Sequence, residues 1–206
     1  MKSLFTRKSP SRRNIVAALF GSALLVGASP AVAAAACASG SESTAFAQFG
    51  DAAQYMPVPS GSFDATAPGW SLSKAAVVSD HDGYGVSSAT HSLAIESSGS
   101  AISPLVCAQS KYPSFRFIVR QLSGGKTAAL NVSVRWLNLL GLPISLSAGT
   151  VPSNSSWTPS PVMKLSQSLP LVGGVLGGLG LEVRLAFQAS GGSFAIDNVY
   201  IDPRMR

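Results

Sequence analysis

Residues 130–136 read LNVSVRW, and every second side chain in this stretch is apolar. The same alternation occurs in FRFIVR at 115–120 and in LEVRLAF at 181–187. A period of two with one apolar face predicts strands that each place one face in a core. Turn signals rich in glycine and serine at 123–125 and 190–192 predict that these strands end in tight turns.

Helical periodicity is nearly absent from the chain, and short alternating stretches separated by Gly, Pro and Ser recur along it. This pattern is typical of an antiparallel sandwich, whose strands have one face in the core and one outside it. We therefore predict an all-β fold, with an irregular lead-in at 37–58 and a β-sandwich at 59–206. Trp136 falls on the apolar face of its strand and is expected in the core, and Trp70, which opens a strand, is expected to pack against the end of the sandwich.

Residues 1–36 have the layout of a secretory signal peptide. A basic head is followed by an apolar run over 15–26, a break at Pro30 and an Ala-x-Ala end at 31–33. The run is shorter than the roughly 20 apolar residues that a membrane span requires. We expect export, cleavage and no integral membrane span in the mature chain.

Two export routes remain open at this point. Residues 11–16, SRRNIV, are similar to a twin-arginine signal, which directs export of folded chains. The sequence AAAC at 34–37 is similar to a lipoprotein box, although Ala34 stands where leucine is usual. The alternatives are a free secreted product and a product lipidated at Cys37.

The basic charge of the chain belongs to its signal. Five of the 15 basic residues and none of the 9 acidic residues lie in 1–36, which leaves 10 basic and 9 acidic residues in the remainder. With a net charge of +1, this part of the chain lacks the excess of basic residues that nucleic-acid binding requires, and we exclude nucleic acid as a partner.

Cys37 and Cys107 are the two cysteines, and in an oxidising compartment we expect them to form a disulfide.

Two segments carry a resemblance to a known family. GSFD at 61–64, followed by Gly69 and Trp70, and FAIDNVYI at 194–201 resemble the opening and closing motifs of galactose-binding-like jelly-roll domains. Many carbohydrate-binding modules have this fold, and the order of motifs is similar to that of uncharacterised secreted proteins of actinobacteria. The resemblance implies an antiparallel jelly-roll β-sandwich.

The closing segment also predicts a β-bulge and a metal site. Ile196 and Val199 both occupy apolar positions although three residues separate them, so the alternation slips at Asp197-Asn198. The resemblance implies a structural calcium between Asp64 and Asp197. The alternative is that Asp197 only accepts hydrogen bonds from backbone at the bulge.

Ligand-binding residues are expected on the polar faces of the strands. We assign glycan contacts to Arg116, Arg120, Asn131, Arg135 and Trp157, because guanidinium and amide groups bind hydroxylated or acidic sugars and an indole can stack on them. If the strands are neighbours, the arginines line one sheet surface. The alternative is a solvated outer face without a ligand.

The sequence offers little for catalysis. His81 lies in Asp80-His81-Asp82-Gly83, which has ordinary turn composition, His91 has no evident partner, and no nucleophile motif occurs. We predict a monomeric, secreted, non-catalytic module that binds carbohydrate of cell walls or the environment. The alternatives are a structural or adhesion protein of the cell envelope, acting through the apolar segment 166–180 or a lipidated Cys37, and a secreted hydrolase.

Overall fold

All secondary-structure elements but one short 3-10 helix are antiparallel strands in the computed structural model, which describes residues 41–108, 114–138, 140–164 and 181–202. The elements are η1 (Ala47–Phe49), β1 (Met56–Pro57), β2 (Ser71–Val78), β3 (Ser92–Ile102), β4 (Val106–Ala108), β5 (Ser114–Leu137), β6 (Pro143–Pro152), β7 (Thr158–Pro159), β8 (Met163–Lys164) and β9 (Leu181–Asp202). The predicted all-β antiparallel fold is confirmed. Within the described ranges, no helix has the length and apolar character to span a membrane.

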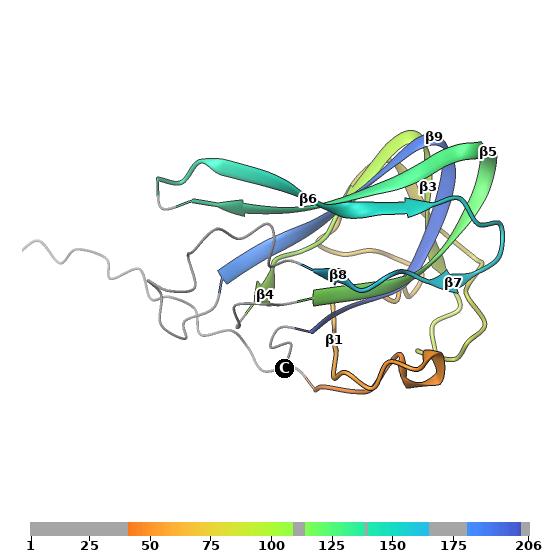
Figure 1. Ribbon diagram of the computed structural model, residues 1–206, viewed down its shortest axis with the longest axis horizontal. Helices are drawn as coiled ribbons and strands as arrows, with labels where there is room; N and C mark the ends of the chain where they lie inside the picture. The colour runs from red at the N-terminus through yellow and green to blue at the C-terminus, as the bar shows by residue number, and fades with distance from the viewer. Residues whose placement is uncertain (1–40, 109–113, 139, 165–180, 203–206) are drawn as a thin grey trace, which may run out of the picture. The chain divides into compact units, whose positions relative to one another are not determined.

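Two long strands, β5 and β9, pair along their whole length, from Ser114 opposite Asp202 to Arg135 opposite Arg184. Both bend sharply near the middle, so the sheet, ordered β2-β3-β9-β5-β6, folds over on itself (Figure 1). We call the part of this sheet with β5 residues 114–121 the first layer and the part with β5 residues 129–137 the second layer.

The predicted turns at 123–125 and 190–192 are wrong, because both strands continue through these residues. Gly124 lies opposite Gly192, and pairing resumes at Ala129 opposite Ser190. A Cβ atom on Gly124, whose φ is +104°, would lie 2.6 Å from the carbonyl oxygen of Gly191, and one on Gly192 would collide with that of Ser123. Glycine at these two positions therefore allows the paired strands β5 and β9 to bend at the same point.

The core lies between the two layers. Phe117 of the first layer meets Phe187 of the second edge to face at 5.0 Å, and Trp70 stacks on Phe187 at 6.0 Å. Trp70 also donates an indole hydrogen bond to the carbonyl oxygen of Pro59. Trp70 and Trp136 are both buried, as predicted.

The lead-in covers the outer face of the first layer. Phe46 and Tyr55 pack against Ile118 of β5 and Tyr200 of β9, in a second apolar cluster separate from the core. On the second layer, by contrast, outward residues such as Asn131 are exposed to solvent. The outer face of the first layer is therefore covered by the lead-in, whereas residues on the outer face of the second layer are accessible to solvent.

Several predictions made from the sequence fall outside the described residues. The signal peptide at 1–36, Cys37 and the apolar segment 166–180 are among them. Cys107 is described, half-buried in β4. The Cys37–Cys107 disulfide, cleavage and lipidation therefore stay predictions.

Candidate functional site

The bend in β5 separates the residues predicted to bind a ligand. Arg116 and Arg120 lie in the first layer, whereas Asn131 and Arg135 lie in the second. In each case the apolar neighbours face the core, so the polar side chains point outward on different layers. This corrects the expectation that the arginines line one sheet surface.

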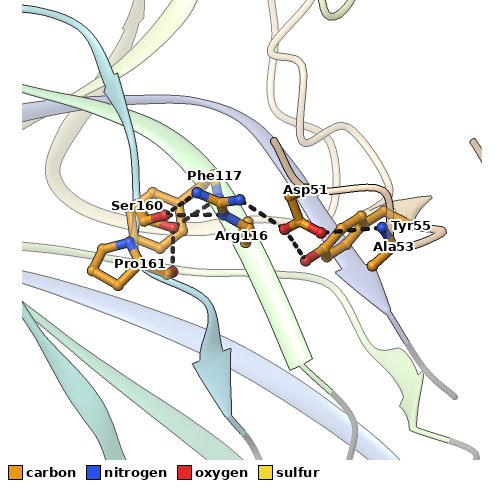
Figure 2. A network of polar contacts seen from close by, with 7 residues as sticks. All are labelled: Asp51, Ala53, Tyr55, Arg116, Phe117, Ser160 and Pro161. Atoms are coloured by element: carbon orange, nitrogen blue, oxygen red, sulfur yellow. Dashed lines mark hydrogen bonds and ion pairs between the residues drawn. The ribbon is translucent and has the colours of Figure 1, made fainter. Parts of the chain in front are cut away.

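Arg116 is enclosed by the lead-in and is 9% exposed. Its Nη1 lies 2.7 Å from Oδ2 of Asp51, and its Nε and Nη2 both donate to the carbonyl oxygen of Ser160, at 3.0 and 2.8 Å (Figure 2). The guanidinium lies over the ring of Phe46, 5.1 Å from its centroid. Three of its N–H groups are thus bonded to the protein, so Arg116 ties the lead-in and the Ser160 segment to the first layer, and its predicted glycan contact stays a prediction.

Asp51 is held equally firmly from the other side. It accepts hydrogen bonds from the Tyr55 hydroxyl at 2.8 Å and from the backbone N–H of Ala53 at 3.1 Å. Burial alone would raise the pKa of Asp51, but the hydrogen bonds from Arg116, Tyr55 and Ala53 outweigh it and lower this pKa below its usual value. The carboxylate is therefore ionised and paired over the neutral pH range.

Arg120 and Trp157 come together on the outer edge of the first layer. The guanidinium of Arg120 lies over the indole of Trp157, 4.9 Å from its centroid, and forms an ion pair with Asp80. Tyr84 donates its hydroxyl to the carbonyl oxygen of Trp157 at 2.6 Å. The loop of residues 80–84 thus packs onto the two residues, and one face of Trp157 is occupied by a cation from the protein.

Asp197 anchors the same loop from beneath. It is 1% exposed and accepts hydrogen bonds from the backbone N–H groups of Asn198, at 2.7 Å, and Asp82, at 3.4 Å. The Asn198 amide in turn donates to Asp82 Oδ2 at 2.6 Å. The predicted bulge is confirmed: Asp197 and Tyr200 pair with Ile118 and Arg116, and Asn198 has a φ of +49°.

We expect the stability of the fold to fall as the pH rises between about 4 and 8. Burial first, and then the charge of Asp82, raise the pKa of Asp197 from 3.8 to about 8. The native state therefore holds a proton that the unfolded chain releases, so stability is greatest below the unfolded pKa and declines until the folded pKa is passed. Urea denaturation at several pH values measures this slope. Asp197→Asn should flatten it, whereas an unchanged slope in that variant would assign it to another group.

The segments that carry Asp64 and Asp197 lie side by side, because the backbone N–H of Val199 donates to the carbonyl oxygen of Gly61 at 3.0 Å. Asp64 is exposed, and no described hydrogen bond or ion pair joins the two carboxylates. The described ranges contain no group of three or more His, Cys, Asp or Glu side chains that could hold a metal ion. The oxygen-bearing side chains beside Asp197 are those of Asp82 and Asn198, and Asn198 Oδ1 is buried without a hydrogen-bond partner. A calcium shared by Asp64 and Asp197 therefore stays a prediction.

The outer face of the second layer is a broad polar surface. Register places one hydrogen-bonding side chain from each of five strands in a single row, namely Ser73, Ser100, Gln188, Asn131 and Thr150. Within this row the described side-chain hydrogen bond is from Thr150 to Asn131, at 3.2 Å. Sequence reasoning found Asn131 by its alternation but missed the rest of the row, because the order of the strands was unknown.

Solved structures of carbohydrate-binding modules share this fold. The CBM22-1 xylan-binding domain of Paenibacillus barcinonensis Xyn10C aligns over 71% of this chain and 94% of its own, with 14% identity and a TM-score of 0.50. The CBM22-1 and GH10 modules of Clostridium thermocellum xylanase 10B, crystallised with xylohexaose, align over 70% of this chain, with 14% identity and a TM-score of 0.51. These similarities establish the carbohydrate-binding-module type of β-sandwich for the chain.

Two of the matched structures are much longer than this chain. The chain matches 28% of the length of the xylanase 10B structure. It also matches 20% of the enzymatically active tailspike domain of bacteriophage CBA120, with 69% of this chain covered, 19% identity and a TM-score of 0.47. No protein-family profile and no curated protein sequence matches the chain.

Proposed function

We propose that the protein is an exported, non-catalytic module that binds carbohydrate on the outer face of its second layer. The observation that supports this most directly is the row of neutral hydrogen-bonding side chains across five strands, four of them exposed and Ser100 half-buried. A sugar presents many hydroxyl groups at short intervals, and a flat sheet surface with amide and hydroxyl side chains can pair with several of them at once. The carbohydrate-binding-module fold supports the same proposal.

Asn131 is the side chain whose loss should affect such binding most clearly, since it is exposed and lies between Gln188 and Thr150 in the row. Asn131→Ala should weaken glycan binding by about 0.5–1.5 kcal/mol, a roughly two- to tenfold loss of affinity. A glycan array identifies the ligand and calorimetry measures the loss. Gln54→Ala, which removes an exposed amide from the lead-in, is the matched control. The proposal fails if no glycan binds, and the site moves elsewhere if both variants bind like the native chain.

We also propose a structural calcium near Asp197, with Asp82 in place of the expected Asp64. Carboxylate and amide oxygens are the ligands calcium prefers, and a cation would relieve the repulsion between Asp82 and Asp197. Adding a chelator should then lower the melting temperature, more strongly at pH 8 than at pH 5, because protonated Asp197 binds calcium poorly. Asp197→Asn should abolish the shift. A melting temperature indifferent to calcium and chelator at both pH values would contradict the proposal.

Adhesion remains a second candidate, supported by the tip of the β5–β6 hairpin. Leu137, Leu140 and Leu142 are 64%, 81% and 55% exposed there, and Asn138 Oδ1 accepts from the backbone N–H groups of Leu140 and Leu142 at 2.9 Å each. Among the described residues of this tip, these three leucines thus form an exposed apolar group, the kind of surface that can mark an interaction site. Binding of the chain to hydrophobic beads, lost in a Leu140→Ser variant, would favour adhesion.

A further inference from the structure

Two arginines lie directly opposite each other on the second layer. Arg135 of β5 pairs in register with Arg184 of β9, and Arg135 is exposed while Arg184 is half-buried. Residues opposite one another on antiparallel strands have Cβ atoms about 4.5–5.5 Å apart, and like charges at that separation destabilise a sheet. The arrangement costs stability unless something anionic lies between the two guanidinium groups.

The described residues do not provide that anion. Arg184 donates from Nη1 to the carbonyl oxygen of Ser103 at 2.9 Å, which fixes its side chain without neutralising it. The ion pairs of the described ranges involve Arg116 and Arg120 and neither of these two arginines. The acid placed on this face by the register is Glu182, the next outward residue on β9, and no hydrogen bond or ion pair from it to Arg135 or Arg184 is described.

The pair adjoins the polar row of the same face. Asn131 lies four residues before Arg135 on β5, about 13 Å along the strand. Ser133 lies between them, and Ser145 lies opposite Arg135 on β6. A sugar chain that runs along β5 would thus meet hydroxyl-pairing groups first and two guanidinium groups at its end.

We propose that this face is selective for glycans that carry carboxylates, with Arg135 and Arg184 binding the carboxylate of a uronic acid. This inference rests on the proposed carbohydrate binding and names its ligand class. A guanidinium fork pairs with a planar carboxylate through two parallel hydrogen bonds, and a carboxylate bound between Arg135 and Arg184 would reduce the repulsion that the register imposes on them. The sugar's hydroxyl groups extend over Ser133 toward Asn131.

The test compares two polymers with one backbone, polygalacturonate and its fully methyl-esterified form, in which each carboxylate is replaced by a neutral methyl ester. Calorimetry with the full chain should give at least tenfold tighter binding of the charged polymer. The double variant Arg135→Gln/Arg184→Gln should lose this preference. Lys126→Gln, which removes an exposed charge at the corner of β5, should keep it. Thermal unfolding establishes that both variants are folded.

The outcomes separate the inference from the proposed function. Equal binding of the two polymers, a preference that survives in the double variant, or binding of neutral glycans alone would overturn the uronate assignment while carbohydrate binding stands. Absence of binding to any glycan would remove both. Loss of the preference in Lys126→Gln as well would attribute it to net charge and overturn the assignment to the two arginines.

Discussion

Replacing Arg116 with methionine is expected to destabilise the fold by about 3–5 kcal/mol, the usual result of removing one partner of a buried ion pair. The methionine would leave the Asp51 carboxylate without its cation and the Ser160 carbonyl without two donors. Urea denaturation, with the unfolding free energy extrapolated to water, measures the loss. Lys126→Met is the control, since its exposed side chain should change stability by no more than about 0.5 kcal/mol.

The dependence of stability on acid pH tests the contact between Arg116 and Asp51 in a second way. The pKa of Asp51 is lowered in the folded state, so the stabilisation it contributes is present above the unfolded value of 3.8 and is lost as the pH falls through the folded value. Arg116→Met should reduce this acid-dependent loss, and a double-mutant cycle with Asp51→Asn should show coupling between the two residues. Additive effects in the cycle, or a loss under 1 kcal/mol for Arg116→Met, would contradict the assigned role.

Removing the Phe187 ring should also cost about 3–5 kcal/mol, as is typical for phenylalanine-to-alanine changes in a core. Phe187 is fully buried and contacts Phe117 across the layers and Trp70 beside it. Thermal unfolding of Phe187→Ala should therefore show a large fall in melting temperature. Phe49→Ala, which removes a half-buried ring outside this core, should show a smaller one. Equal falls would mean that the two layers do not depend on Phe187 for their contact.

Alternation along the sequence predicted which side chains face the core. Phe115, Phe117 and Val119 on β5, and Val183, Leu185 and Phe187 on β9, all lie in the cluster between the layers. A period of two is a local property of a strand, so the side chains that face the core can be assigned without knowing which strands lie beside it. The slip at Asp197-Asn198 is equally local, and the bulge was predicted correctly for that reason.

Long-range pairings could not be predicted in the same way. Alternation assigns Arg116 to an outer face, but it does not say that Asp51, 65 residues earlier, covers that face. Asp82 as the neighbour of Asp197 was missed for the same reason, and the resemblance suggested Asp64 instead. Glycines at 124 and 192 favoured turns because a glycine that ends a strand and one that bends a paired strand have the same local signature.

The corner shared by β5 and β9 has a consequence for how the chain acquires its structure. Pairing of Ser114 with Asp202 and of Arg135 with Arg184 joins residues 88 and 49 positions apart, and β9 is the central partner in both layers. Neither layer can close until β9 has been synthesised, and so high a contact order is typical of domains that fold in milliseconds to seconds. The nascent chain therefore stays unfolded while most of it is being made, and its two layers close together, late, around one C-terminal strand.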